Sequence, residues 1–331
     1  MRSSADTLRA RVRARSNIAL IKYWGKADAT LNTPAVGSIS ITLNDLWTET
    51  EIQFDPSLAA DELLLNGVAR ADQLERVSRC LDLVRGLAGS DVSARVVSKN
   101  NFPTGAGLAS SASGFAALVG AATAALRLDC TARDLSILAR RGSGSAARSV
   151  FGGFVEMHKG EAADGTDSYA EPLADAEAWP LRVLVAITAR AEKATGSGPG
   201  MTLSADTSPY YADWVATHAA DLDTARDAIV SRDFAKLAEV SEWSCLKMHA
   251  AAMSTVPPLI YWNGATVDCL KRIRELRSNG VPVFFTIDAG PQVKAICLPE
   301  AEDAARSALE DIAGVVDVLA TGLGPGLERL A

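Results

Sequence analysis

The amino-acid sequence predicts a soluble globular protein of mixed helices and strands, of the α+β or α/β class. Three observations support this prediction: a length of 331 residues, a composition that is 48% hydrophobic and 22% charged, and two kinds of apolar spacing along the chain. A chain of this length and composition can bury a full-sized core. It is long enough for two domains, or for one large domain with a long cleft.

Strands are expected where apolar residues alternate with polar ones or run on without a break, and helices where they recur at helical spacing. The expected strands are 8–21, 38–54, 92–98, 150–158, 181–189 and 281–297. The expected helices are 72–89, 110–126, 132–141, 206–231, 233–253, 265–278 and 300–313. Two breaks, the acidic and Ala-rich segment 162–178 and the Gly-rich segment 196–200, flank an apolar run. We therefore expect two domains, residues 1–187 and residues 188–331.

Composition and charge argue against several classes of protein. There are 33 Lys and Arg against 40 Asp and Glu, a net charge of −7, which argues against a nucleic-acid surface but not against a small anionic substrate. The 5 Cys form no CxxC pair and there are only 3 His, so neither a disulfide framework nor a zinc site is expected, and the cytoplasm fits best. No apolar stretch approaches the roughly 20 residues of a membrane span. The Arg-rich start, 8–15, alternates strictly, which predicts a strand rather than a transit peptide.

A Pro- and Gly-rich loop runs directly into a helix of small residues at 100–114. Gly105 and Gly107 allow the backbone to approach a ligand, and the free N–H groups at the start of the helix attract an anion. Ser110 and Ser111 add hydroxyls for phosphate or Mg²⁺. The segment predicts a phosphate-binding loop, with an ordinary Gly loop before a Ser-capped helix as the alternative. It is not a Walker A loop, because no Gly-Lys-Ser/Thr follows.

A second Gly/Ser segment, 140–154, follows a predicted helix and leads into a predicted strand. Ser143, Ser145 and Arg148 are suited to binding an anion, and the planar guanidinium fits a carboxylate or a phosphate. The alternative is a capped turn with a solvated arginine. A dinucleotide fingerprint is excluded, because the third glycine is absent and no strand precedes the segment.

Two lysines and a tyrosine, Lys22, Tyr23 and Lys26, stand at the end of the first predicted strand, where the chain must turn. Lys22 is expected to be either an anchor for an anionic substrate or one half of a structural ion pair. Asn17, on the same strand, is expected either to hold a side chain of a cleft by hydrogen bonds or to cap the turn.

The apolar run 281–291 predicts a buried strand that delivers Asp288 to a Gly-Pro turn. A carboxylate at the end of an apolar strand is well placed for catalysis, and the alternative is an Asx-turn. His158, His218 and His249 are expected to have structural roles.

Together these four segments resemble the mevalonate diphosphate decarboxylase family. That family lies within the superfamily of small-molecule kinases (GHMP) that includes galactokinase, homoserine kinase, mevalonate kinase and phosphomevalonate kinase. The Lys-Tyr-Trp-Gly-Lys run at 22–26 is characteristic of the decarboxylases. The matching segments, which follow the family order over essentially the whole chain, are 17–26, 100–114, 140–154, 192–197, 200–201, 207–209 and 285–291.

The resemblance implies an α+β, GHMP-kinase-like fold of two lobes around one deep cleft. The N-terminal lobe would resemble ribosomal protein S5 domain 2, and the C-terminal lobe would be ferredoxin-like. The implied reaction is ATP-dependent decarboxylation of mevalonate 5-diphosphate to isopentenyl diphosphate, ADP, phosphate and CO₂, by way of 3-hydroxyl phosphorylation, in the mevalonate pathway of isoprenoid biosynthesis. The implied cofactors are ATP and Mg²⁺, and the implied assembly is a homodimer.

The resemblance also implies roles for individual residues. Asp288 matches the catalytic aspartate, and Lys22 should lie beside it. Arg148 matches the arginine that holds the substrate carboxylate, with help from Asn17. The residues that match the site for the 5-phosphates are Tyr23, Lys26, Ser143, Gly144 and Ser145, with Ser197 on a flexible loop that closes over the phosphates. The residues that match the ATP site are Ser98 at the adenine pocket, then Pro103, Gly105, Ala106, Gly107, Leu108, Ala109, Ser110 and Ser111, with Ser110 also at Mg²⁺.

Two departures from the family pattern concern the substrate. Many members read Pro-hydrophobic-Asn-Ser-Ser where this chain has Pro-Ala-Val-Gly-Ser at 34–38, and the usual Cys before the arginine is Ala147. Fewer polar groups around Val36, Gly37 and 198–199 would fit a monophosphate. Decarboxylation of mevalonate 5-phosphate to isopentenyl phosphate is therefore one alternative. The others are a mevalonate 3-kinase of the same fold without decarboxylation and a non-catalytic nucleotide-binding regulator.

Overall fold

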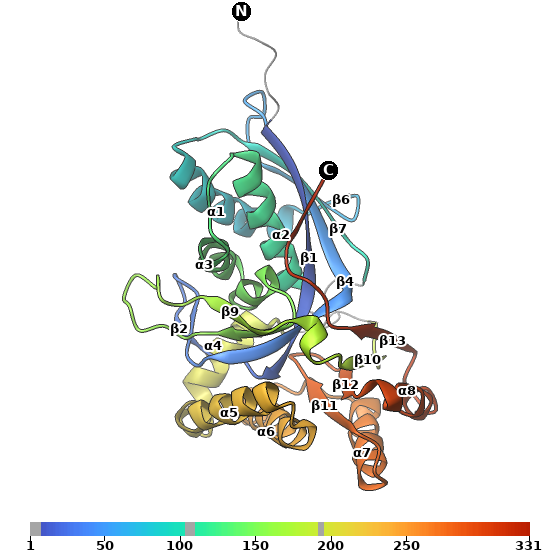
Figure 1. Cartoon of the computed structure of the whole chain (residues 1–331). Helices are drawn as coiled ribbons and strands as arrows, with labels where there is room; N and C mark the ends of the chain where they lie inside the picture. Colours follow the sequence, from blue (N-terminus) through green and yellow to red (C-terminus); the bar gives the residue numbers. More distant parts are fainter. Residues whose placement is uncertain (1–7, 103–109, 191–194) are drawn as a thin grey trace, which may run out of the picture.

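The computed structural model describes residues 8–102, 110–190 and 195–331, which form two lobes, each built on one sheet (Figure 1). The first sheet has the order β14 (Glu328–Leu330), β1 (Leu8–Ile21), β4 (Ser38–Phe54), β7 (Ala94–Asn100), β5 (Glu62–Leu65) and β6 (Val68–Ala69), and β8 (Phe154–Met157) and β9 (Ala170–Ala174) extend it from β4. The second sheet has the order β11 (Val283–Ile287), β12 (Val293–Cys297), β10 (Arg182–Ile187) and β13 (Asp317–Gly322). A short hairpin joins β2 (Lys26–Asp28) to β3 (Thr33–Pro34).

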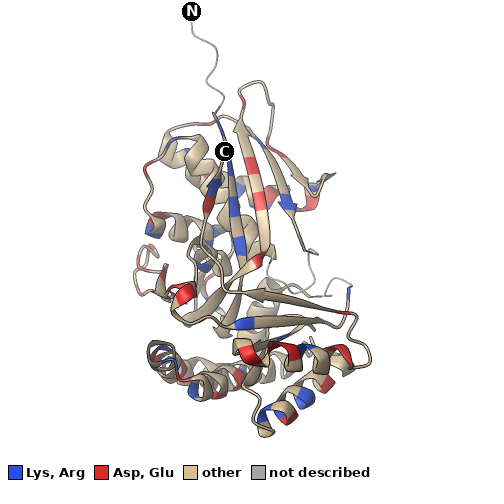
Figure 2. Cartoon of the chain, turned by 45° about the vertical axis from the view of Figure 1, so that its right-hand side comes forward, with Lys and Arg blue, Asp and Glu red and all other residues tan. Residues whose placement is uncertain are grey.

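The first half of β1 is amphipathic, as its alternating sequence predicts. Ala10, Val12 and Ala14 are buried, and the arginines that alternate with them pair with glutamates of the neighbouring strand β4. These pairs are Arg9 with Glu51, and both Arg11 and Arg13 with Glu49. Figure 2 shows the two rows of opposite charge side by side on the long strands. The Arg-rich start of the chain is thus a strand with one apolar face.

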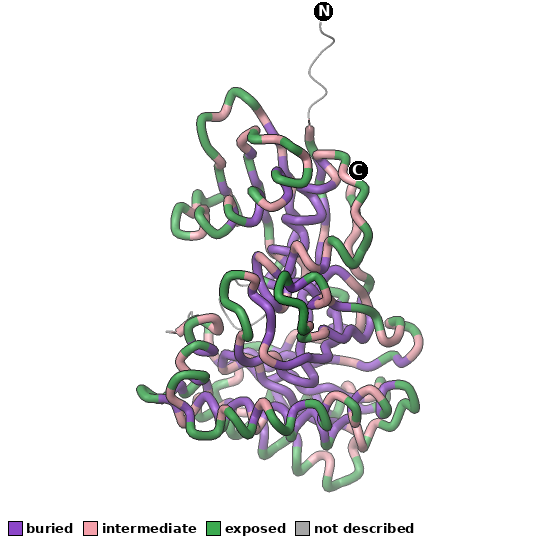
Figure 3. The backbone as a smooth tube through the Cα atoms, turned by 90° about the vertical axis from the view of Figure 1, so that its left-hand side faces the viewer, coloured by how far each residue is buried: buried purple, intermediate pink, exposed green. Residues whose placement is uncertain are grey.

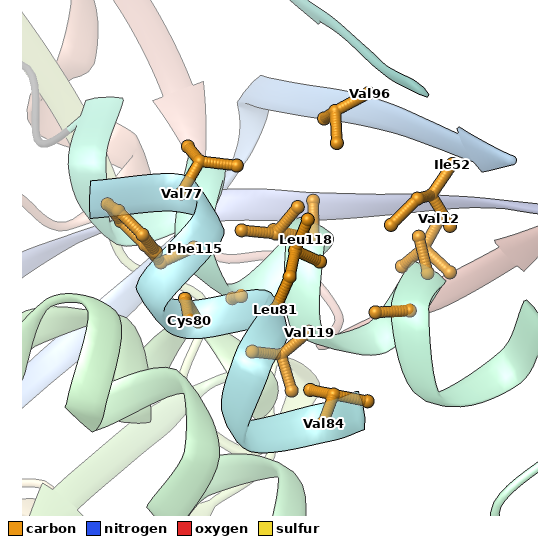
Figure 4. Close-up of a cluster of buried hydrophobic side chains, with 14 of the residues drawn as sticks. Val12, Ile52, Val77, Cys80, Leu81, Val84, Val96, Phe115, Leu118 and Val119 are labelled. Atoms are coloured by element: carbon orange, nitrogen blue, oxygen red, sulfur yellow. The ribbon is translucent and has the colours of Figure 1, made fainter. Parts of the chain in front are cut away.

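Helices α1 (Ala71–Ala88) and α2 (Ser110–Ala125) cover the other face of this sheet, and α3 (Ala132–Gly142) packs against both of them. The small residues of α2 let the helix pack closely on β1 and β4. Figure 4 shows part of the resulting core, in which Leu81 of α1 and Phe115 and Leu118 of α2 cluster with Val12 and Ile52 of the sheet. This packing fixes the first turn of α2, which is the predicted phosphate-binding end of the helix.

The second sheet is covered by α7 (Gly264–Ser278) and α8 (Glu302–Glu310). Three further helices, α4 (Ser197–Thr207), α5 (Tyr211–Ser231) and α6 (Phe234–Met253), complete the lower lobe. One buried cluster joins the lobes, with Ile18 and Ile39 from the first sheet, Val183 and Ile296 from the second, and Leu237 from α6. Figure 3 shows the buried backbone concentrated where the lobes meet. A common core therefore connects the two halves of the molecule.

Each predicted strand segment contains a strand, and each predicted helical segment contains a helix. The segment 281–297 forms two strands that are joined through the Gly-Pro turn. The C-terminal strand β14 returns to the first sheet, and β10, which the expected boundary after residue 187 assigns to the first domain, pairs within the second sheet. We therefore propose a domain boundary before β10. None of the described helices is long and apolar enough to cross a membrane.

The prediction of a break at 196–200 was wrong beyond Gly196, because α4 begins at Ser197. The flexible loop that the resemblance implies at Ser197 stays a prediction. Pro199 is compatible with a helix here, since N–H groups in the first turn have no partner within the helix. Gly200 is required by packing: a Cβ at this position would lie 2.6 Å from the Tyr261 hydroxyl and 3.1 Å from the Trp24 ring. The glycine and the proline therefore serve helix packing and helix initiation.

Candidate active site

A cleft of about 1250 Å³ lies between the lobes. The end of β1, the starts of α2 and α4, the loop after α3 and the turn after β11 all contribute to its walls. All the predicted site residues that the structure describes line this cleft: Asn17, Lys22, Tyr23, Lys26, Ser98, Ser110, Ser111, Ser143, Gly144, Ser145, Arg148, Ser197 and Asp288. The other predicted residues lie outside the described residues: Pro103, Gly105, Ala106, Gly107, Leu108 and Ala109.

Asp288 lies directly after β11 and contacts two lysines. Its Oδ1 is 2.7 Å from the Lys22 Nζ and its Oδ2 is 3.3 Å from the Lys294 Nζ. Both lysine side chains are 1% exposed, whereas that of Asp288 is 26% exposed toward the cleft. The Lys22 ammonium also donates to the Ala19 carbonyl oxygen at 2.8 Å. The apolar strand end thus presents one carboxylate whose two oxygens each contact an ammonium group.

The electrostatic state of Asp288 follows from these neighbours. Burial alone would raise the pKa of this carboxyl group, but the ammonium groups of Lys22 and Lys294 hold it well below its usual range. Asp288 is therefore ionised at neutral pH. An ionised carboxylate with so low a pKa is a weak base, yet it can accept a hydrogen bond and oppose positive charge.

Arg148 forms a second centre, on the 3-10 helix η1 (Gly144–Val150). Its Nη1 donates to the Ser38 hydroxyl at 2.6 Å and its Nη2 donates to the Asn17 Oδ1 at 3.1 Å. The Asn17 Nδ2 in turn donates to the Ser145 carbonyl oxygen at 3.0 Å and to the Ser149 hydroxyl at 2.8 Å. The buried Arg148 Nε has no hydrogen-bond partner among the described residues. Burial lowers the pKa of Arg148 to about 10, so the guanidinium stays charged at neutral pH.

A third group of side chains surrounds the loop after α3. A Cβ on Gly144 would lie 2.3 Å from the Tyr23 hydroxyl, so only glycine allows the tyrosine to approach this backbone. Burial raises the pKa of Tyr23 to about 12, which keeps its hydroxyl protonated and able to donate. Lys26 is half-buried, and burial together with the nearby Arg76 lowers the pKa of its ammonium. Hydroxyl, ammonium and guanidinium donors thus converge on one wall of the cleft.

One end of the cleft, beside β5 and β7, carries apolar side chains next to the charged residues at the start of α1. Leu63, Leu65 and Val96 line it together with Ser98, whose hydroxyl lies 2.9 Å from that of Thr50. Such a pocket suits a flat aromatic ring with a few polar atoms. Ser111, at the start of α2, lies 3.4 Å from the Ser143 hydroxyl and links this end to the third group.

The described residues contain no cluster of three or more His, Cys, Asp or Glu that could hold a metal ion. Of the predicted metal-binding groups, the Ser110 hydroxyl at the start of α2 lines the cleft. Mg²⁺ often uses only one or two protein ligands and takes its others from phosphates and water. The residues present therefore fit an ion carried by phosphate groups and do not form a separate metal cage.

Two residues of the cleft region were not predicted from the sequence. Lys294 is the one charged residue within the apolar strand β12. Because a buried charge needs a partner, its position in an apolar run could have indicated an ion pair. Arg76 donates to the Gly142 carbonyl oxygen at 2.7 Å and lies over the Phe115 ring at 4.5 Å. On the sequence Arg76 looks like any arginine of an exposed helix face, so no signal was available there.

The structure bears on the departure at 34–38 and does not explain the replacement of Cys by Ala147. Neither Val36 nor Gly37 is among the described residues that line the cleft. A Cβ on Gly37 would lie 2.8 Å from the Leu222 side chain of α5 and 3.0 Å from the Met157 carbonyl oxygen, so a larger residue there would require these neighbours to shift. Ala147 is buried in a small apolar cluster. The 198–199 stretch, at the start of α4, does line the cleft.

Comparison with known proteins matches both lobes to one family. Residues 14–170 match the profile of the diphosphomevalonate decarboxylase-like N-terminal domain, and residues 183–318 match that of the mevalonate 5-diphosphate decarboxylase C-terminal domain. Diphosphomevalonate decarboxylase from Candida albicans is 36% identical, over 96% of this chain and 96% of that protein.

Solved structures agree with these matches. Mevalonate diphosphate decarboxylase from Staphylococcus aureus superposes with a TM-score of 0.92 at 38% identity, covering 98% of each chain. A complex of MDDEF with MVAPP, AMPPCP and magnesium superposes with a TM-score of 0.91 at 40% identity, covering 98% of this chain and 99% of that one. The chain therefore belongs to the mevalonate diphosphate decarboxylase family, and its α+β fold is the GHMP-kinase-like fold of that family.

Proposed function

We propose that this protein is an ATP-dependent decarboxylase that converts mevalonate 5-diphosphate to isopentenyl diphosphate, ADP, phosphate and CO₂. The family, at this identity and coverage, supports the reaction. The observation that carries the proposal is that Asp288 and Arg148, which would serve the two halves of the reaction, line a single cleft.

The chemistry explains why two charged centres are needed. A β-hydroxy acid has no carbonyl group that could accept the electrons released as CO₂ leaves. The 3-hydroxyl must therefore become a good leaving group first, and phosphorylation achieves this. One centre must act at the 3-hydroxyl and the other must hold the carboxylate.

We assign the 3-hydroxyl to Asp288. Its ionised carboxylate accepts a hydrogen bond from the hydroxyl and so orients the oxygen for attack on phosphorus. Because its pKa is held low by Lys22 and Lys294, full removal of the proton before phosphoryl transfer is disfavoured. A loose phosphoryl-transfer transition state needs little such removal. The same carboxylate then opposes the positive charge that develops at C3 as phosphate leaves.

We assign the substrate carboxylate to Arg148. Its Nη1 and Nη2 are already oriented by Ser38 and Asn17, and each of these nitrogens carries a second N–H that can donate to a ligand oxygen. A charge-assisted hydrogen bond from a pre-oriented guanidinium fixes the carboxylate for the departure of CO₂.

The donors around the loop after α3 fit the 5-phosphates. Tyr23 and Lys26, with the hydroxyls and backbone of Ser143, Gly144 and Ser145, form this wall. Lys26 lies beside Arg76, so each cation disfavours the other until an anion arrives. Binding of a diphosphate relieves that repulsion.

The part of the cleft lined by Leu63, Leu65 and Val96 fits the adenine ring beside Ser98. The start of α2, with Ser110 and Ser111, fits the ATP phosphates and their Mg²⁺. When bound, ATP and Mg²⁺ supply the phosphoryl group and neutralise its developing charge. Ser197, at the first position of α4, presents its end of the helix to the same space and would contribute to excluding water.

An assay of ADP and CO₂ release tests the proposal. Mevalonate, mevalonate 5-phosphate and mevalonate 5-diphosphate are each incubated with protein, ATP and Mg²⁺. ADP and CO₂ in equal amounts from the diphosphate alone would support the proposed function. The same ratio from the monophosphate alone would identify a monophosphate decarboxylase, ADP without CO₂ a kinase, and ATP binding without turnover a regulator.

We further propose, on family resemblance, that the protein is a cytoplasmic homodimer. Light scattering at micromolar concentration measures the mass of the assembly against the 34.7 kDa chain. A mass equal to that of one chain would contradict the homodimer, and fractionation of cells tests the location.

A further inference from the structure

The strand that delivers Asp288 lies at the edge of its sheet. Among the described strands β11 pairs with β12 on one side only. Its outward-facing N–H and C=O groups therefore need other partners, because unpaired buried backbone groups are costly. Phe285 and Ile287, two residues apart, direct backbone groups toward this open edge.

Side chains of α6 occupy the open edge. The Glu242 carboxylate accepts from the Phe285 N–H at 3.2 Å. The Cys245 thiol accepts from the Ile287 N–H at 3.2 Å and donates to the Ile287 carbonyl oxygen at 3.6 Å. The His249 Nε2 lies 3.2 Å from the same carbonyl oxygen. Positions 242, 245 and 249 share one helix face, so this face takes the place of a neighbouring strand.

The hydrogen-bond partner and the burial of His249 determine its tautomer and its charge. A carbonyl oxygen can only accept, so Nε2 carries the proton and donates to Ile287. The imidazole is 1% exposed, and burial lowers its pKa to about 3, with Lys22 acting in the same direction. His249 is therefore neutral at physiological pH, and its hydrogen bond does not switch there.

Helix α6 also contacts the backbone of Lys22, the partner of Asp288 in the ion pair. The Ser244 hydroxyl accepts from the Lys22 N–H at 3.0 Å. Ser244 and Cys245 are adjacent, so one turn of α6 fixes the backbone of Lys22 and that of Ile287, the residue before Asp288. Neither Ser244, Cys245 nor His249 is among the described residues that line the cleft. Since none of the three can touch a ligand in the cleft, we infer that they act on the reaction through the backbones of Lys22 and Ile287.

We propose that Ser244, Cys245 and His249 are positioning residues of the reaction. They fix the backbone of Lys22 and that of Ile287, the residue before Asp288, and so set the 2.7 Å contact between the Lys22 and Asp288 side chains. The inference rests on the proposed function, because it assigns these contacts to the turnover of a phosphorylated mevalonate. A displacement of a reacting group by about 1 Å can cost a hundredfold in rate.

Paired substitutions test the proposal. Cys245→Ala and His249→Met remove the hydrogen bonds with little change in size, whereas Cys245→Ser and His249→Gln retain groups that can make them. Ser244→Ala is the least disruptive variant and keeps the test valid should either of the others fail to fold. Cys269→Ala is the matched control, because Cys269 is as fully buried in the same core cluster but lies on α7.

We expect kcat to fall about ten- to hundredfold in Cys245→Ala, His249→Met and Ser244→Ala. KM for ATP and for the mevalonate substrate should stay within about twofold, because the cleft walls are unchanged. Cys245→Ser and His249→Gln should recover most of the rate, and Cys269→Ala should keep it. Rates near that of the unchanged protein in the first three variants, or losses as large in Cys269→Ala, would overturn the proposal.

Amide hydrogen exchange separates this proposal from the proposed function. The Lys22 amide should exchange faster in Ser244→Ala, and the Ile287 amide faster in Cys245→Ala, whether or not a substrate is known. If the unchanged protein released no CO₂, the proposed function would fail while the exchange experiment still reported on positioning. Unchanged exchange at both amides would contradict the positioning contacts themselves.

Discussion

The two charged centres of the cleft are held in opposite ways. Asp288 comes from the second sheet and contacts the ammonium groups of Lys22 and Lys294. Arg148 comes from the first lobe and donates only to uncharged oxygens, those of Ser38 and Asn17, in the part of the chain that the structure describes. The charge of Asp288 is thus compensated within the protein, whereas that of Arg148 has no acidic side chain at ion-pair distance among the described residues.

The difference fits the charges that each centre has to meet. A free carboxylate beside the 3-hydroxyl would repel the phosphates and the carboxylate of the substrate, and the two lysines prevent this. Arg148 feels Asp288 only at longer range and has no carboxylate in direct contact among the described residues, so a substrate carboxylate can become its direct counter-ion. The burial that lowers the pKa of Arg148 to about 10 is therefore the cost of a site prepared for an anion.

Asp288→Asn should produce the largest effect on turnover. We expect kcat to fall about a thousandfold, because a neutral amide cannot oppose charge at C3 and presents donors as well as acceptors to the hydroxyl. The melting temperature should also fall, since Lys22 and Lys294 would be left as buried cations without a carboxylate. CO₂ release, ATP titration and thermal unfolding measure these effects. A rate within tenfold of the unchanged protein, with ATP affinity retained, would remove Asp288 from its role.

Arg148→Gln tests the opposite centre. We expect turnover to fall about a hundredfold while ATP affinity is retained, because the carboxylate loses its charge-assisted partner. The melting temperature should change less than in Asp288→Asn, since removing a buried charge that has no direct ion pair offsets the hydrogen bonds that are lost. Thermal unfolding of the two variants side by side decides this. A larger loss of stability in Arg148→Gln would break the comparison between the centres.

Lys294→Met measures how much the second lysine contributes to the low pKa of Asp288. We expect kcat to fall about tenfold and the acid limb of the pH–rate profile to move to higher pH. The direction follows because Lys294 helps to hold the pKa of Asp288 low, so that without it the carboxylate takes up a proton at a higher pH. Lys294→Arg keeps the charge and serves as the control. An unchanged acid limb in Lys294→Met would show that Lys22 alone sets the state of the carboxylate.

The sequence predicted Asp288 but not Lys294, although both are charges in the apolar run 281–297. Asp288 stands at a Gly-Pro turn, where a polar residue suggests a functional site. Lys294 lies inside a strand, and the local sequence does not show which acidic side chain it contacts. The contact between Lys22 and Asp288, 266 positions apart, was expected only through family resemblance. Long-range pairings such as that of β14 with β1 depend on the whole topology, which periodicity does not contain.

Helix α4 could not be predicted for a different reason. Its first turn contains Gly198, Pro199 and Gly200, residues that commonly end regular structure. The helix forms because its later turns pack against the aromatic cluster, with the Trp24 indole N–H donating to the Ser204 hydroxyl at 2.9 Å. Tertiary contacts outweighed local propensity, as they do for most helices.

Gly37→Ala has the smallest expected effect and probes the Arg148 side alone. Its new Cβ would press on Leu222 and on the Met157 carbonyl oxygen, so we expect a loss of about 1–3 kcal/mol in the free energy of unfolding. Turnover should fall only slightly, through the neighbouring Ser38 that accepts from Arg148. Gly86→Ala on α1 is the control, because a Cβ there meets nothing within 4 Å and should stabilise the helix.

In the Gly37→Ala experiment, the ratio of activity on mevalonate 5-diphosphate to that on the monophosphate tests whether this segment affects substrate choice. Since neither Val36 nor Gly37 is among the described residues lining the cleft, the ratio should stay within about twofold of that of the unchanged protein. The departure at 34–38 is then a consequence of packing against α5 and not a change of substrate. If the ratio shifted instead, the Gly37 segment would contribute to recognition of the distal phosphate, and the Arg148 side of the cleft would determine substrate choice as well as hold the carboxylate.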